Sequence, residues 1–427
     1  MGMALSGSPT VVNVGAAAIF AAAVAHTFCA RYFERLAHAQ PSHAGVWHLL
    51  GEIEVAFGFW AMVLLAFLAF QNGTDESLHY LESRNFTEPA FVFVILVIAA
   101  SRPIIDAAGA VLYGMSRLLP LERPVAYYFT LLAVAPLLGS FITEPAAMVL
   151  SALLLRQRFF SKNAPQSFLY ATVGVLFVNI SIGGTLTPYA APPVLMVADR
   201  WGWDITAMLT LFGWKAAIAV VINAAIVTLV YRSFLRDLPT MSSALGRLDV
   251  PGWVVAVHLA FLIGVVLFSH HPFVFAALLL FFLGFAEAYK RYQSRLMLRE
   301  GLLVAFFLAG LVVLGGQQVW WLQPLLANAS PDPLYFGATL LTAITDNAAL
   351  TYLGSLVEGV SEEFKYSLVA GAVTGGGLTV IANAPNPAGY AILKGSFEDG
   401  AISPGGLAAA AALPTLVAVA AFRLLPG

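Results

Sequence analysis

GGTLTPYAAPP (183–193) interrupts a long apolar stretch, and GGGLTVIANAP interrupts another one at 375–385. The two sequences share two glycines, a Leu-Thr pair, an alanine and the final proline at matching positions. Glycine allows strained backbone, whereas proline removes a hydrogen-bond donor and stops a helix. Each apolar stretch is therefore predicted to break into two half-helices, with free carbonyl groups and a helix N-terminus at the break.

A second matched pair of sequences precedes the two breaks. FITEPAAMVL (141–150) aligns with AITDNAALTY (343–352), so that the acid Glu144 falls on the acid Asp346. Both pairs recur in the same order, at offsets of 202 and 192 residues. We therefore predict two repeats, covering residues 1–235 and 250–427.

The composition places the chain in lipid. Of its 427 residues, 60% are hydrophobic and 10% are charged, and its mean hydropathy is +0.84. Soluble proteins carry about 25% charged residues, so a soluble enzyme and a nucleic-acid binder are excluded. The single cysteine excludes a disulfide framework and a cysteine metal site. No nucleotide-binding motif is present, so we expect neither enzymatic activity nor a cofactor.

Ten apolar stretches are close to the roughly 20 residues that cross a bilayer as a helix. They are residues 11–35, 47–70, 88–115, 166–198, 206–232, 251–270, 271–290, 301–326, 364–394 and 404–425. Residues 124–157 and 334–357 are also apolar, but polar tips interrupt them, and we predict two re-entrant hairpins there. The expected fold is an all-α polytopic membrane protein with about ten transmembrane helices plus two re-entrant hairpins.

The basic residues orient this topology. Of the 21 lysines and arginines, 15 fall on one side and four on the other, which makes the first side cytoplasmic. Hairpin 124–157 then opens from the cytoplasm, hairpin 334–357 opens from outside, and both termini lie outside. Each repeat holds three spans, a hairpin, a broken helix and a last span. Because five crossings are an odd number, the second repeat is inverted relative to the first, as in secondary transporters.

The hairpin tips and the breaks offer the oxygen ligands of a hard cation. Carboxylate, hydroxyl, amide and carbonyl oxygens come to the same depth there. A charge at the bilayer centre costs at least about 2.5–3.5 kcal/mol, so an acid at that depth needs a function. Two simpler explanations remain open. The glycines could only allow close helix packing, and each carboxyl could only cap its half-helix, which Pro145 makes more plausible at Glu144.

SIGGTLTPYAAPP (181–193), TDNAAL (345–350) and IANAPNP (381–387) resemble motifs of the ion transporter superfamily. Its members include D-type sodium/proton antiporters, arsenite permeases and divalent-anion/sodium symporters. The resemblance implies a homodimer in which a transport domain shifts like an elevator against a scaffold domain. It also implies where sodium binds. The implied cation- and proton-binding residues are Thr143, Glu144, Gly183, Gly184, Thr187, Thr345, Asp346, Asn347, Gly375, Gly376 and Asn383.

One departure from the superfamily pattern indicates the cargo. The dicarboxylate symporters carry a neutral Ser-Asn-Thr motif at each tip, whereas this chain has Glu144 and Asp346. A fixed anion repels an anionic substrate and attracts a cation, and desolvation lets a buried carboxyl hold a proton instead. We therefore expect exchange of a monovalent cation, sodium first, for protons, in the bacterial inner (plasma) membrane. The alternative is a sodium- or proton-coupled organic-anion carrier; the matched breaks disfavour a channel or an inert scaffold.

Other polar residues within the spans are weaker candidates. Asn179 lies one turn before the first break and could reach the site. Lys215 could neutralise a carboxylate when the cation leaves, or merely snorkel. Asp106 and Arg102 are four residues apart and should pair with each other. His48, Glu52 and Glu54 begin the second span; they could relay protons, but we favour a solvated or scaffold role.

Overall fold

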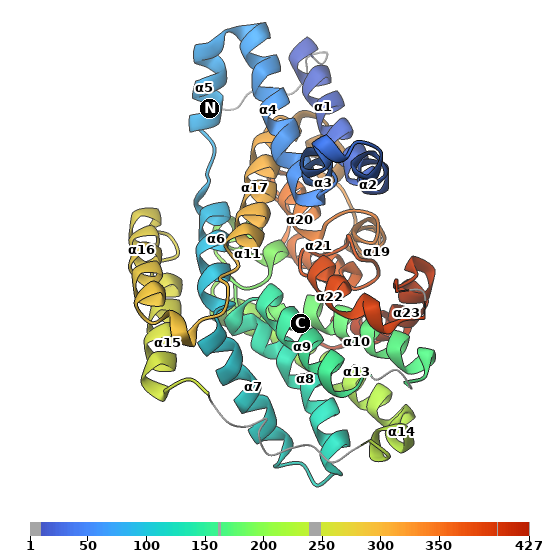
Figure 1. Cartoon of the computed structure of the whole chain (residues 1–427). Helices are drawn as coiled ribbons and strands as arrows, with labels where there is room; N and C mark the ends of the chain where they lie inside the picture. The colour runs from blue at the N-terminus through green and yellow to red at the C-terminus, as the bar shows by residue number, and fades with distance from the viewer. Residues whose placement is uncertain (1–9, 161–163, 239–248, 399, 427) are drawn as a thin grey trace.

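The structure is a computed structural model that describes residues 10–160, 164–238, 249–398 and 400–426. Helices are its regular elements, and no strand occurs in these four ranges (Figure 1). Six helices are long and apolar enough to cross a membrane, or seven if one bent pair counts as a single span. The chain is therefore a multi-pass helical membrane protein. Three more apolar helices have 16 or 17 residues, so ten crossings stay a prediction.

The first seven helices differ from the predicted spans at three places, the first of which is an interruption at residues 51–52 inside the expected span 47–70. They are α1 (Val11–Thr27), α2 (Ala30–Ala39), α3 (Ala44–Leu50), α4 (Ile53–Asn72), α5 (Thr74–Glu82), α6 (Thr87–Ala99) and α7 (Arg102–Ser116). The expected span 11–35 ends at Thr27, and α2 follows as a separate, more polar helix. The expected span 88–115 bends by 66° between α6 and α7, because Pro103 at the start of α7 cannot continue the helix before it.

The next segment contains the first predicted hairpin and the first predicted break. It forms α8 (Arg123–Ile142), α9 (Glu144–Arg158), α10 (Gln166–Gly183), α11 (Pro192–Trp201), α12 (Ile205–Met208), a π-helical turn (Leu209–Gly213), α13 (Trp214–Val230) and α14 (Arg232–Arg236). Helices α8 and α9 pack against each other as a hairpin. The first arm is longer than expected: α8 runs through Pro136 for 20 residues, about 30 Å, which is enough to cross a bilayer.

The last segment contains the second predicted hairpin and the second predicted break. It forms α15 (Gly252–Leu267), α16 (Pro272–Ala288), α17 (Leu298–Gly315), α18 (Val319–Leu326), α19 (Pro331–Thr342), α20 (Asn347–Ser355), α21 (Glu362–Gly375), α22 (Asn386–Leu393) and α23 (Pro404–Leu424). The expected span 301–326 divides into α17 and α18, with Gly315 and Gly316 at the division. Helices α19 and α20 form the second hairpin, and α15 and α16 stand beside α6 at one side of the molecule (Figure 1).

Both predicted helix breaks are present. Helix α10 ends at Gly183, and regular α-helix resumes only at Pro192. Helix α21 ends at Gly375, and α22 begins at Asn386. The two broken helices cross near their breaks: Ser181 Oγ donates a hydrogen bond of 2.7 Å to the carbonyl of Val373. A Cβ on Gly377 would overlap the backbone of Val178, so only glycine permits this approach.

The half-helices pack in a reciprocal way. The first half-helix of each break lies on the first arm of its own hairpin, α10 on α8 and α21 on α19. The second half-helix lies on the other hairpin, α11 on α20 and α22 on α9. These four packing relationships therefore correspond between the two halves of the chain.

Helices α1, α4 and α17 form a group that lies against hairpin arm α20. Helices α4 and α17 approach closely, since a Cβ on Gly310 would overlap the backbone of Phe57 and Gly58. This backbone contact fixes the start of α4, which carries Glu54, relative to α17, and α17 in turn contacts α20.

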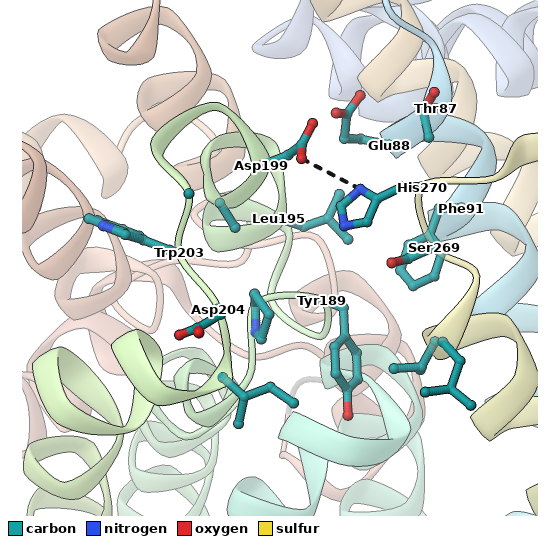
Figure 2. A pocket seen from close by; sticks show the side chains of 16 residues that line it. Thr87, Glu88, Phe91, Tyr189, Leu195, Asp199, Trp203, Asp204, Ser269 and His270 are labelled. Carbon is teal, nitrogen blue, oxygen red and sulfur yellow. Dashed lines mark ion pairs between the residues drawn. The ribbon is translucent and has the colours of Figure 1, made fainter.

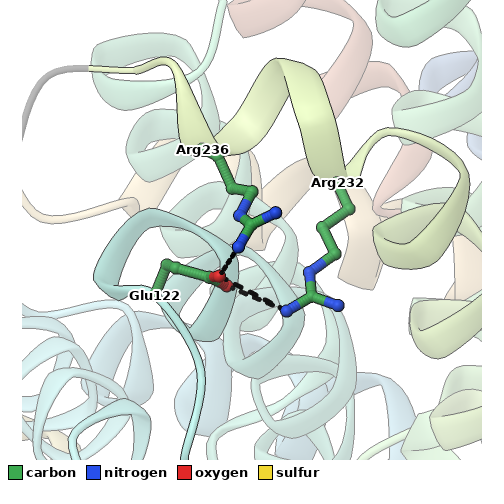
Figure 3. A network of polar contacts seen from close by, with 3 residues as sticks. All are labelled: Glu122, Arg232 and Arg236. Atoms are coloured by element: carbon green, nitrogen blue, oxygen red, sulfur yellow. Dashed lines mark hydrogen bonds and ion pairs between the residues drawn. The ribbon is translucent and has the colours of Figure 1, made fainter.

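At the opposite end of the molecule, one ion-pair network ties α8 to α14. The carboxylate of Glu122, the residue before α8, lies 3.3 Å from Arg232 Nη2 and 2.5 Å from Arg236 Nη2 (Figure 3). All three side chains are partly exposed. The network holds the loop before the first hairpin to the short helix that follows α13.

Candidate functional site

Glu144 is the buried acid of the first hairpin tip. It is the first residue of α9 and is 0% exposed. Its Oε2 accepts a hydrogen bond of 2.9 Å from Nδ2 of Asn383, which lies in the second break. Its Oε1 has no hydrogen-bond partner and faces Gly184, where a Cβ would overlap the carboxylate. Glu144 therefore contacts residues of both helix breaks.

Asp346, the acid of the second tip, has a different environment. It is the N-cap of α20, and its Oδ1 accepts hydrogen bonds from the N–H groups of Ala348 (2.8 Å) and Ala349 (3.1 Å). Capping was thought more plausible at Glu144, but the Glu144 side chain makes no cap. The reason is position: Asp346 precedes its helix, whereas Glu144 already lies inside the first turn, after Thr143.

Thr143 turns the chain between α8 and α9. Its backbone has φ 73° and ψ 148°, a conformation that a β-branched residue rarely adopts. Its side chain is 3% exposed, and its Oγ1 has no hydrogen-bond partner. Within the described ranges, Thr143 is the only non-glycine residue with a positive φ, and such strain tends to occur at functional sites.

The tips and breaks hold several buried oxygens without a protein hydrogen bond. Asn347 is 0% exposed, and although its N–H donates to the carbonyl of Ala382, both polar atoms of its side chain are unpartnered. Asn386 donates to the carbonyls of Gly376 and Thr379, but its Oδ1 is unpartnered. The full set of such oxygens is Thr143 Oγ1, Glu144 Oε1, Thr342 Oγ1, Asn347 Oδ1, Asn383 Oδ1 and Asn386 Oδ1.

Such a concentration of unpartnered oxygens is unusual. Buried polar groups are nearly always hydrogen-bonded, and leaving one unpaired costs about 1–3 kcal/mol. The donor set contains a carboxylate, amides and hydroxyls, which are the ligands of a hard cation. The residues present therefore fit a hard cation.

Other predicted residues use their polar groups or their small size to hold the helix breaks against neighbouring helices. Thr187 Oγ1 donates to the carbonyl of Ser140, and Ser140 Oγ donates to the carbonyl of Gly183 (2.7 Å). Thr345 Oγ1, just after α19, donates to the carbonyl of Leu341 in the last turn of α19. Cβ atoms on Gly183 and Gly375 would overlap the backbones of α8 and α19. These contacts brace the breaks, so part of the glycine pattern does serve close packing.

Gly376 belongs to the polar part of the second break. A Cβ there would overlap Ser181 Oγ and lie 3.0 Å from Asn347 Nδ2. Its carbonyl accepts a hydrogen bond of 2.7 Å from Asn386. Gly376 thus lies between the first broken helix and the second hairpin tip.

The structure gives the three accessory candidates other partners. Asn179 bonds to the carbonyls of Leu132 and Val220 and accepts from Asn223, so it ties α10 to α8 and α13. Lys215 Nζ lies 3.1 Å from Tyr366 Oη and faces the Tyr366 ring. Asp106 pairs with Arg102 at 3.3 Å, as predicted.

Sequence reasoning missed several residues of the site. Asn386 and Thr342 add unpartnered oxygens, and Ser140 and Ser181 bond across the breaks. The second asparagine of IANAPNP was a visible signal. Glu54 was assigned a solvated or scaffold role, yet it lines a small cavity together with Asp346 and Asn383.

An acidic pocket of about 460 Å³ opens beside the first break. Figure 2 shows Tyr189, which belongs to the break, lining it together with Glu88, Asp199 and Asp204. His270 Nδ1 lies 3.5 Å from Asp199 Oδ1. Carboxylates that line an open pocket raise the local concentration of cations.

The comparisons with known proteins agree with this chemistry. A family model described as "Putative Na+/H+ antiporter" matches residues 11–425, which is nearly the whole chain. No curated protein matches the chain.

Proposed function

This chain belongs to the Na+/H+ antiporter family, and on that premise we propose that it exchanges sodium ions for protons at Glu144 and Asp346. Membership makes it a membrane transporter of the cation/proton exchange type, not an enzyme. Sodium as the cation and the two acids as the exchange groups are the parts that we propose.

The observation that carries the proposal is the state of the Glu144 carboxylate. It is fully buried, one oxygen is held by Asn383, and the other has no protein partner. A buried carboxylate needs either a counter-cation or a proton, because an isolated charge in such a place is costly. The cation and the proton would bind to the same carboxylate oxygen, so binding of one excludes binding of the other. Exchange follows when the site meets the two sides of the membrane in turn.

We also propose how the site alternates between the two sides. The reciprocal packing of the half-helices supports two inverted repeats, with the site at their interface. The group α1, α4 and α17 would serve as a scaffold against which the hairpins and broken helices move like an elevator. A homodimer in the bacterial inner membrane is proposed from the superfamily resemblance alone.

Everted membrane vesicles from an antiporter-deficient bacterium provide the test. A preformed pH gradient is followed while sodium, lithium, potassium or calcium is added, for the wild type, Glu144→Gln and Asp346→Asn. We expect sodium to dissipate the gradient in the wild type and not in Glu144→Gln, because the amide can neither release a proton nor neutralise the cation. An exposed-acid variant, Asp75→Asn, is the matched control and should resemble the wild type.

Two results would contradict the proposal. If no cation affects the gradient although the wild-type protein is present in the membrane, cation/proton exchange is wrong. If Glu144→Gln and Asp346→Asn both exchange at the wild-type rate, the assigned site is wrong.

A further inference from the structure

A small cavity joins the second hairpin to the α1, α4 and α17 group. Its volume is about 20 Å³, and Glu54 from α4, Phe307 from α17, Asp346 and Asn383 line it. A cavity of about 10–15 Å³ or more holds one water molecule. This space therefore fits one water molecule or an ion of similar size, and it lies directly beside the acid of the second tip.

Asn383 connects this cavity to Glu144. Its Nδ2 is bonded to Glu144 Oε2, while its Oδ1 has no partner and its side chain is 1% exposed. An unsatisfied, buried amide oxygen next to a water-sized space indicates a ligand that the protein itself does not supply. Together with the carboxylates of Glu54 and Asp346, this oxygen completes a donor set suited to a cation.

Glu54 differs from its neighbour Glu52 in one respect that matters here. Glu52 is paired with Arg299 at the start of α17, so its charge is largely neutralised. Glu54 makes no ion pair with any residue in the described ranges, although Glu52, Arg299 and Asp346 are the charged groups around it. The carboxylate of Glu52 is thus bound to an arginine, whereas Glu54 lines the cavity.

We infer that Glu54 is a further binding residue for the transported cation, which Glu54, Asp346 and the Asn383 carbonyl oxygen hold in the small cavity next to Glu144. The inference rests on the proposed function. Asn383 belongs to both positions, because its Nδ2 is bonded to Glu144 Oε2 and its side chain also lines the small cavity.

The proposed elevator movement would change this second cation position. Glu54 lies on the proposed scaffold, whereas Asp346 and Asn383 lie on the proposed moving part. The cation position that they share forms only while the two parts face each other as they do here. Glu54 would then act on cation binding from one side of the membrane only.

Purified protein reconstituted into liposomes tests the inference. Sodium-driven proton flux is measured with a trapped pH-sensitive dye as a function of sodium concentration on each side, for the wild type, Glu54→Gln, Glu54→Asp and Glu52→Gln. We expect Glu54→Gln to raise the sodium concentration that gives half-maximal flux by about tenfold or more on one side, with a smaller effect on the maximal rate. Glu54→Asp should recover most of the affinity, and Glu52→Gln should stay within about twofold of the wild type.

The possible outcomes separate the two proposals. If the wild type exchanges sodium for protons but Glu54→Gln keeps its half-saturating sodium concentration, Glu54 is not a binding residue. If Glu52→Gln weakens binding as much as Glu54→Gln, a general loss of negative charge explains the effect, and the inference is wrong. If the wild type itself shows no sodium-driven flux, the proposed function fails and the inference with it. A Glu54→Gln protein that elutes as aggregate is replaced by Glu54→Ala, which also removes the carboxylate and should raise the half-saturating sodium concentration in the same way.

Discussion

Asn383 Nδ2 donates a hydrogen bond of 2.9 Å to Glu144 Oε2, although the two residues are 239 positions apart in the chain. This bond joins the tip of the first hairpin to the break of the second broken helix. A hydrogen bond to a charged group is worth about 1.5–3 kcal/mol. We therefore expect Asn383→Ala to weaken sodium binding by about 10- to 100-fold.

The sodium concentration for half-maximal proton flux measures this effect. Asn72→Ala, at the exposed end of α4, is a suitable control because it removes an amide far from any helix break. If the half-saturating sodium concentration is unchanged in Asn383→Ala, the hydrogen bond does not position the Glu144 carboxylate for cation binding, and the prediction is wrong.

Thr143 provides a test of a trade-off between stability and binding. Its backbone conformation, φ 73° and ψ 148°, costs a β-branched residue about 1–3 kcal/mol. Thr143→Gly should therefore raise the melting temperature of the purified protein by about 2 °C or more, while the loss of Oγ1 weakens sodium binding. Thr143→Ser keeps the hydroxyl and should bind sodium like the wild type. A lower melting temperature for Thr143→Gly would show that the turn is not strained.

Gly184 and Gly337 form a matched pair for testing how closely the break approaches the acid. A Cβ on Gly184 would overlap Glu144 Oε1, whereas a Cβ on Gly337, within α19, meets nothing within 4 Å. Gly184→Ala should abolish exchange, because the carboxylate must move away from its position beside the break. Gly337→Ala should leave exchange intact and add up to about 1 kcal/mol of helix stability. Equal activity in the two variants would place the cation elsewhere than beside Gly184.

Glu122 should make the stability of the loop region depend on pH. Its own backbone amide and the guanidinium groups of Arg236 and Arg232 hold the pKa of its carboxyl below the ordinary 4.5. Because the folded-state pKa is the lower one, the stabilisation is complete above the unfolded-state value and is lost as the pH falls through the folded-state value. Between pH 6 and about pH 3.5, Glu122→Gln should therefore lose less of its melting temperature than the wild type.

Salt provides the control for the Glu122 prediction. The three side chains are partly exposed, so a salt concentration of about 1 M should screen their pairing and bring the two melting curves together. Parallel pH dependences of the wild type and Glu122→Gln at low salt would contradict the prediction.

The sequence predicted the parts of the site that depend on local rules. Gly183-Gly184 and Gly375-Gly376 end their helices because glycine and the prolines that follow act over a few residues. The ends of α10 and α21 and the turns at the two hairpin tips therefore lie where the sequence predicts them, whereas the re-entrant course of the hairpins stays a prediction. The bend at Ser101 and the division after Gly315 depend on the same residue types. A single proline or glycine within an apolar stretch is, however, a weak sign of a helix end, so both stretches were predicted as continuous spans.

Contacts between residues far apart in the sequence could not be predicted from such local rules. No local pattern indicates that Asn383 holds Glu144, or that Glu54 rather than Glu52 lines a cavity with Asp346. Likewise, Asp346 is the residue before its helix, whereas Glu144 is the first residue within its helix. An alignment of the two tip sequences places the two acids at the same position and does not show this difference. These features appear only when segments from both halves pack together.

The reciprocal packing of the half-helices has a consequence for biogenesis. Arm α9 is covered by α22, and α11 is covered by α20, so the first half cannot bury these surfaces until the second half has been synthesised and inserted. Contacts between such distant segments form late and leave polar and apolar surface exposed in the meantime. The N-terminal half, expressed alone, should be recognised by membrane quality-control proteases, and co-expression of the C-terminal half as a separate chain should protect it.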